Sequence, residues 1–195
     1  MTDDMSITLE EALPEELFRA FLTKVCPEIY DPYSEHFADT PRRFTQMVQE
    51  LTNGDETSWR FTTFKSDSRE MVINKNIKFV SLCAHHVAPF TGVAHIGYIP
   101  DGQVAGLSKF ARYVQAAAHT LTSQEDLTTT LADQLTDILN PTGLAVVMEA
   151  THSCMTNRGA LAHGTETTTS AMRGVFLHNT RGSKTEFFQL LRGLS

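Results

Sequence analysis

The first third of the chain carries apolar residues with the spacing of two amphipathic helices. Pro14 suits the first turn of one helix, and an apolar stripe follows as far as Val25, before Cys26 and a proline end the pattern. Thr40, followed by a proline, suits the N-cap of a second helix, whose apolar residues recur at i, i+3, i+4 and i+7. We therefore expect a helical segment within residues 1–60.

From residue 59 onward the spacing of apolar residues shortens towards two, the period of a β-strand. The pattern predicts two strands, two helices, two more strands and a final helix with a capping box formed by Ser183 and Glu186. The first central helix is expected to bury an apolar stripe from Phe110 to Leu121. The expected strands span residues 70–82, 90–99, 144–150 and 165–176, and the central helices are expected to be capped by Ser108 and Ser123.

These elements predict an α+β fold in which four strands form an antiparallel sheet with both central helices on one face. Such a sheet exposes two edges, and natural proteins pair, cover or close exposed edges. Closure through a ring of subunits is one remedy, which predicts a homo-oligomer, and a monomeric α+β sandwich with blunted edges is the alternative. We place the domain boundaries at residues 1–60 for the helical segment and 61–195 for the α+β domain with its C-terminal helix.

The composition is that of an ordinary globular protein, with 41% hydrophobic and 20% charged residues. No apolar run approaches the roughly 20 residues of a membrane helix. Asp3 and Asp4 stand where a secretory signal carries basic residues, so we expect a cytoplasmic protein with no membrane partner. The net charge of −7 argues against nucleic acid as a partner. However, 13 of the 23 acidic residues lie in residues 1–60, so the remainder is nearly neutral and compatible with a small anionic substrate.

The residues suited to chemistry concentrate in two short stretches that contain both cysteine and histidine. Cys83 and His86 are three residues apart, a spacing with which one turn of chain directs a thiolate and an imidazole at a single metal ion. Cys154 can supply a third ligand, which leaves the fourth position of a zinc ion for water, as in catalytic zinc sites. If the chain is extended there, His152 points into the same site, and His85 becomes a second free imidazole near the metal.

Each of these signals has a simpler interpretation. A lone C-x-x-H spacing occurs by chance, so reduced structural thiols and a core histidine are the alternative to a metal site. A disulfide between Cys83 and Cys154 is another alternative, and a cytosolic setting disfavours it. Cys26 lies on the apolar stripe of the first helix and is expected to be a small buried packing residue.

Several motifs in a consistent order make the chain resemble a known family. They are Cys83-Ala84-His85-His86, Gly106-Leu107-Ser108-Lys109, Gln124-Glu125 and His152-Ser153-Cys154-Met155. From about residue 39 to the C-terminal helix, the chain resembles GTP cyclohydrolase I. The resemblance implies the tunnelling fold (T-fold), in which sheets of neighbouring subunits close into barrels, and a homodecamer with active sites between subunits. It also implies hydrolysis of GTP to 7,8-dihydroneopterin triphosphate and formate, which feeds folate, other pterins or 7-deazaguanine bases.

The resemblance implies a role for each matching residue. The metal ligands for Zn²⁺ are Cys83, His86 and Cys154, and the catalytic residues are His85 (ribose opening), His152 (protonation of the imidazole ring of the base) and Ser108 (close to the sugar and phosphate). The substrate-binding residues are Glu125 for guanine, Gln124, and, for the triphosphate, Arg43, Lys109, Arg112 and Arg158. A carboxylate suits guanine because N1–H and the 2-amino group are adjacent donors, and guanidinium groups suit phosphate oxygens.

Five positions depart from the family pattern. Ala84 stands where Glu is common, Gln46 where Lys is frequent, and His119, Thr120 and Asp126 where Arg is common. The missing positive charge motivates two alternatives, namely a catalytically silent homologue that binds a purine or pterin, and a cyclohydrolase with altered nucleotide preference, such as dGTP. A zinc nucleoside deaminase is disfavoured, because the H-x-E and P-C-x-x-C signatures of that class are absent.

Overall fold

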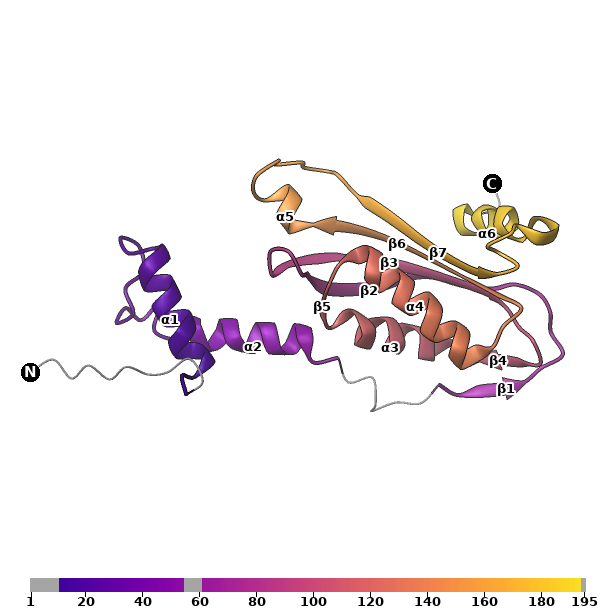
Figure 1. The fold of residues 1–195 in the computed structure, drawn as a ribbon, viewed down its shortest axis with the longest axis horizontal. Coiled ribbons are helices and arrows are strands. Elements are labelled where there is room, and N and C mark those ends of the chain that lie inside the picture. Colours follow the sequence, from indigo (N-terminus) through magenta and orange to yellow (C-terminus); the bar gives the residue numbers. More distant parts are fainter. Residues whose placement is uncertain (1–10, 55–60, 194–195) are drawn as a thin grey trace, which may run out of the picture. The chain divides into compact units, whose positions relative to one another are not determined.

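The computed structural model describes residues 11–54 and 61–193 (Figure 1). The chain divides into two compact units, Met1–Glu50 and Leu51–Ser195. Helices and strands are both present, which confirms the predicted α+β class. The predicted boundary at residue 60 and the acidic N-terminus fall in residues 55–60 and 1–10, outside the described residues. In the described part of the chain, every helix is too short or too polar to cross a lipid bilayer.

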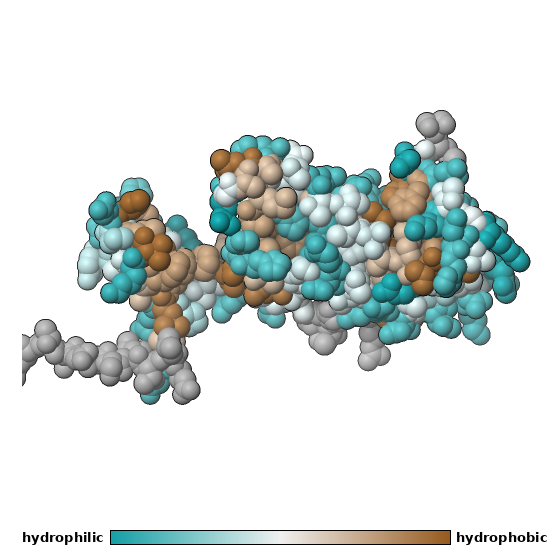
Figure 2. Space-filling view, turned by 45° about the horizontal axis from the view of Figure 1, so that its top comes forward, coloured by the Kyte–Doolittle hydropathy of each residue, from teal (hydrophilic) through white to brown (hydrophobic). Residues whose placement is uncertain are grey.

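The first unit contains the two predicted helices, α1 (Pro14–Val25) and most of α2 (Thr40–Thr52). They contact through Phe18 of α1 and Phe44 of α2, whose rings stack with centroids 3.9 Å apart. However, no residue of α1 is buried in the described part of this unit, and Phe21 is 54% exposed. Cys26 is only half-buried, so its predicted burial is wrong for a single chain. Figure 2 shows the resulting apolar surface of this unit in brown.

The second unit is built on a five-stranded sheet whose four long strands are antiparallel neighbours, as predicted. The strands are β2 (Val72–Cys83), β3 (Ala88–Ile99), β6 (Gly143–His152) and β7 (Thr167–Gly174). A fifth strand, β5 (Leu121–Thr122), pairs in parallel with the end of β2. A separate ladder joins β1 (Thr63–Lys65) to β4 (Gln103–Ala105). The three short strands were not predicted, because two or three residues are too few to establish a period of two.

Alternation along the strands gives the sheet two apolar faces. One face packs against α3 (Leu107–Ala118) and α4 (Gln124–Leu139), and Phe90, Phe110 and Leu131 are fully buried there. The other face packs against α6 (Ser183–Arg192) through Phe187, which lies among Ala145 and other strand residues. Both central helices therefore lie on one face of the sheet, and the C-terminal helix lies on the other (Figure 1).

The predicted start and end of the first central helix are wrong in detail, whereas the predicted start of the second is correct. Gly106, and not Ser108, is the N-cap of α3, and Leu121 is 47% exposed because α3 ends at Ala118 and Leu121 belongs to β5. The predicted N-cap Ser123 is correct, since its side chain accepts a hydrogen bond from the backbone N–H of Asp126.

The predicted capping box of α6 is also wrong. Ser183 is the first residue of α6, after the N-cap Gly182, and its hydroxyl donates to the carbonyl of Val175, 2.9 Å away. The carbonyl oxygen of the Asn179 side chain instead accepts from the backbone N–H groups of Lys184 and Thr185. An asparagine several residues upstream therefore does what Ser183 was expected to do, because the loop before α6 folds back on its first turn.

Gly97 of β3 provides a test of the packing of α6. A Cβ at this position would lie 2.6 Å from ring carbons of Phe187, which is fully buried and has no room to move. We expect Gly97→Ala to destabilise the protein by about 1–3 kcal/mol, seen as a lower midpoint of thermal or denaturant unfolding. Gly106→Ala is the matched control, because the nearest atom to its Cβ is 3.5 Å away. Equal midpoints for the two variants would contradict this packing.

Candidate active site

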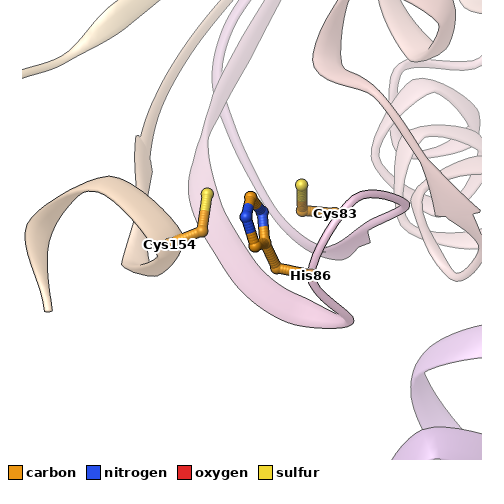
Figure 3. A group of neighbouring side chains, drawn as sticks. All are labelled: Cys83, His86 and Cys154. Carbon is orange, nitrogen blue, oxygen red and sulfur yellow. The ribbon is translucent and has the colours of Figure 1, made fainter. Parts of the chain in front are cut away.

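The three predicted metal ligands come from the ends of neighbouring strands. Cys83 ends β2, His86 lies in the turn that leads to β3, and Cys154 follows β6. Because β3 pairs antiparallel with both β2 and β6, the C-terminal ends of β2 and β6 lie at the same end of the sheet, beside the start of β3. The ligand atoms of the three residues all lie within 4.8 Å of one another. Figure 3 shows the His86 ring between the two thiols.

A tight turn holds His86 beside Cys83. The backbone N–H groups of His86 and Val87 both donate to the carbonyl of Cys83, at 3.3 and 2.9 Å. Val87 has a φ of +50°, a left-handed conformation that is unfavourable for a β-branched residue. Strain of this kind costs on the order of 1–3 kcal/mol and is concentrated at functional sites. The turn therefore keeps His86 beside Cys83 in spite of the unfavourable backbone conformation of Val87.

Cys154 reaches the site by a route that differs from the prediction. The chain is not extended from residue 152 to 154, because Ser153 begins the short helix α5 (Ser153–Thr156). The hydroxyl of Ser153 donates to the carbonyl of Pro89, and the hydroxyl of Thr156 donates to the carbonyl of His152. The first bond ties the helical turn to the start of β3, and the second closes the turn itself. Both His152 and Cys154 still line one cavity.

The donor set fits a zinc ion. Two thiolates and one imidazole favour zinc over metals that prefer oxygen ligands, and three protein ligands leave one coordination position open. Burial raises the pKa of the Cys154 thiol, and the adjacent Cys83 raises it further, whereas the charge of Arg158 opposes the change. A metal that binds here must therefore displace thiol protons, as is usual for zinc. The three ligand residues line a cavity of about 250 Å³.

His152 stands at the wall of this cavity in a well-defined environment. Its Nε2 atom lies 2.7 Å from the side-chain oxygen of Gln124, and its ring stacks on Phe90 with centroids 4.7 Å apart and planes 2° from parallel. Burial lowers the pKa of His152, and the negative charge of Glu125 partly opposes this shift. The imidazole is therefore neutral near pH 7 and suited to accept or donate a proton.

His85 and Glu125 also line the cavity. His85 is exposed, and its Nδ1 atom lies 3.7 Å from the sulfur of Cys83. Glu125 lies in the first turn of α4, where the helix dipole stabilises a carboxylate. Both residues therefore line the same cavity as the candidate metal ligands.

Within the second unit, the residues expected to bind the triphosphate do not line this cavity. Ser108, Lys109 and Arg112 lie in the first half of α3, a helix of 12 residues that spans about 17 Å and whose far end leads to β5 beside Cys83. None of the three lines the cavity. Arg158 is exposed and close enough to affect the pKa of Cys154. Arg43 belongs to the first unit, where it lies 3.6 Å from Asp39.

The positions that depart from the family pattern have local structural contacts. Gln46 accepts a hydrogen bond from Arg42 at 2.8 Å, and Asp126 accepts one from the hydroxyl of Ser123 at 2.8 Å. His119 and Thr120 line a separate cavity of about 320 Å³ between the end of α3 and α4. Ala84 is exposed, and its N–H donates to the carbonyl of Thr122.

Together, a mixed α+β fold, a Cys₂His group at one end of the sheet and a histidine fixed by hydrogen bonding beside it are typical of enzymes that use a metal ion. Comparison with known proteins specifies the family. A family model described as GTP cyclohydrolase I matches residues 15–192. The chain belongs to the GTP cyclohydrolase I family.

Individual relatives agree with the family model. GTP cyclohydrolase 1 of Halalkalibacterium halodurans is 45% identical over 167 residues, which cover 84% of this chain and 88% of that protein. GTP cyclohydrolase 1 2 of a Nostoc species is 45% identical over 166 residues, covering 83% and 76% of the two chains. Among solved structures, the apo form of archaeosine synthase QueF-Like covers 56% of this chain and 97% of its own, at 20% identity and a TM-score of 0.43. A match as distant as the last one says nothing about function.

Proposed function

We propose that this protein is a zinc-dependent GTP cyclohydrolase I, which hydrolyses GTP to 7,8-dihydroneopterin triphosphate and formate. The observation that carries the proposal is the convergence of Cys83, His86 and Cys154 beside His152 in a chain of this family. When bound by the two cysteines and His86, zinc supplies Lewis acidity and makes water a nucleophile near neutral pH.

The other residues of the cavity bind and orient the purine. The carboxylate of Glu125 accepts hydrogen bonds from N1–H and the 2-amino group of guanine, which places C8 towards the metal group. His152 exchanges a proton with the imidazole ring of the base, and His85 exchanges one with the ribose during ring opening. Burial of His152 supports this role, because it keeps the imidazole neutral near pH 7.

We propose further that the complete site forms between two copies of the chain. Ser108, Lys109 and Arg112 of one copy would bind the sugar and triphosphate of a nucleotide whose purine lies in the cavity of another copy. Their absence from the cavity of their own chain supports this arrangement. Arg158 and Arg43 would add to the same phosphate site.

The assembly that suits this arrangement is a cytoplasmic homodecamer of T-fold subunits. Two features support it, namely the unpaired edge of β7 in the single chain and the apolar surface of α1. Edge strands of neighbouring subunits would pair to close the sheets into barrels.

Mass spectrometry of the reaction products tests the activity. Metal-analysed protein incubated with GTP is expected to release formate and the dihydropterin triphosphate in equal amounts, with turnover proportional to zinc content. A folded, zinc-loaded oligomer that forms no product from GTP would exclude the proposed function.

Uncharged or acidic residues at positions where the family has basic ones favour two other candidates. They are a cyclohydrolase with altered nucleotide preference and a catalytically silent homologue. Gln46, His119 and Thr120 reduce the positive charge expected near a triphosphate. The same assay run with dGTP separates the cases. Faster turnover of dGTP indicates altered preference, and binding of GTP without turnover indicates a silent homologue.

A further inference from the structure

Gln124 is the most completely enclosed polar side chain near the cavity. It is 1% exposed, and it lies in the first turn of α4, directly after the N-cap. From there its side chain reaches under β6 and β7, where it contacts three acceptors and one histidine. Both polar atoms of the Gln124 amide already have hydrogen-bond partners within the protein, so this side chain is not available to bind a guanine.

The contacts of Gln124 determine which end of its amide faces His152. The Nε2 atom lies 3.1 Å from the carbonyl of Met148, 2.9 Å from the carbonyl of Thr167 and 3.1 Å from the hydroxyl of Thr169. Two of these partners are backbone carbonyls, which only accept hydrogen bonds. The amide NH₂ group must therefore face them, and the amide oxygen must face His152.

A second layer of hydroxyl groups reinforces this orientation. The hydroxyl of Thr128 donates to the backbone carbonyl of Gln124 at 2.6 Å. The Thr128 oxygen is therefore left to accept from the hydroxyl of Thr169, also 2.6 Å away. The Thr169 hydroxyl has then used its proton, so its oxygen is a third acceptor, beside the two carbonyls, for the two hydrogens of the Gln124 amide. All three acceptors lie on the NH₂ side of the amide, which leaves the amide oxygen facing His152.

The same logic assigns the protons of His152. Because the amide oxygen of Gln124 only accepts, the Nε2 atom of His152, 2.7 Å away, must carry a hydrogen. Stacking on Phe90 holds the plane of the ring. In the described part of the second unit, the Nδ1 atom of His152 has no hydrogen-bond partner, so it is the nitrogen left to exchange a proton.

We propose that Gln124 is a positioning residue, which holds His152 as the Nε2–H tautomer and so makes Nδ1 the atom that transfers the proton to and from the substrate. This inference rests on the proposed function for the use of that proton, but the tautomer itself does not depend on the activity. It also separates Gln124 from its neighbour Glu125, since only Glu125 has a side chain free to bind guanine.

Gln124→Met tests the proposal, because methionine has a similar length and volume but accepts no comparable hydrogen bond. We expect kcat for GTP to fall roughly 10- to 100-fold, less than the loss on removing a general acid–base altogether, with KM changed less than about threefold. Thr136→Val is the matched control. Its hydroxyl lies on the same helix but donates to the carbonyl of Ala132, outside the contacts of Gln124 and His152, so kcat should stay within about threefold of wild type.

Solid-state ¹⁵N NMR of zinc-loaded, histidine-labelled protein at about pH 8 reports the tautomer directly, with the signal of His152 assigned by its loss in His152→Gln. We expect an Nε2–H signal in wild type and in Thr136→Val, and a mixture of tautomers in Gln124→Met. An Nδ1–H signal in wild type would overturn the proposal, even if Gln124→Met did not fold. A rise in KM with kcat unchanged would instead make Gln124 a substrate reader. If wild type released no formate, the proposed function would fail while the NMR result still decided the role of Gln124.

Discussion

Replacement of Cys154 by serine is expected to abolish formate release from GTP and to remove the bound zinc. The ligand atoms of Cys83, His86 and Cys154 lie within 4.8 Å of one another, so loss of one leaves only two protein ligands. A serine hydroxyl does not ionise near neutral pH and is a poor zinc ligand, whereas a metal supplies several kcal/mol of transition-state stabilisation. We therefore expect activity to fall on the order of 10³-fold or more.

Elemental analysis of the purified variant, together with the formate assay, measures both effects. Cys26→Ser is the matched control, because Cys26 is half-buried in the first unit and outside the Cys₂His group. This control should keep its zinc and its activity. A Cys154→Ser variant that retained full zinc and full turnover would show that the metal group has been assigned wrongly.

Two inactive variants are expected to regain activity when they assemble together. The first variant is Cys154→Ser, which lacks the metal group, and the second is the double variant Lys109→Ala with Arg112→Ala, which lacks phosphate ligands on α3. If each site combines the cavity of one copy with α3 of another, random assembly from equal amounts pairs two intact halves at about a quarter of the sites. Each variant alone should be inactive.

Co-expression of the two variants with different affinity tags, followed by purification on both tags, isolates the mixed oligomers. Their turnover should approach about a quarter of the wild-type value, and zinc content should be about half. Oligomers that contain both chains but remain inactive would exclude a shared site formed with α3. The double variant is not expected to unfold, because Arg112 is exposed and Lys109 is only partly buried.

The predicted helices illustrate what local sequence can specify. The bounds of α1 and α2 match the prediction closely, because a proline in the first turn and apolar residues three and four apart act within a few residues of chain. The caps of α3 and α6 do not match, since both helices begin before the serine that was expected to cap them, at the N-caps Gly106 and Gly182. Capping depends on the conformation of the preceding loop, which a sequence pattern does not contain.

The candidate site divides in the same way. The motifs around Cys83 and Cys154 were sufficient to predict a metal group, although the helical turn at Ser153 was missed, because four residues are too few to show a helical period. The role of the Thr128 and Thr169 hydroxyls had no signal in the sequence. They contact Gln124 from residues up to 45 positions apart, and hydroxyl-bearing residues at such separations are common in any chain.

The sequence by itself therefore determined the order of the long helices and strands, the α+β class and three residues that could hold a metal ion, because these depend on local periodicity and on residue type. Only the tertiary structure decided which nitrogen of His152 contacts Gln124. That outcome depends on the pairing of β6 with β3 and β7, and on the packing of α4, which together bring Gln124 and His152, 28 residues apart, to 2.7 Å. It also decided that the phosphate-binding positions of α3 do not line the cavity of their own chain, because the direction of a helix across a sheet is set by packing and not by the spacing of its apolar residues.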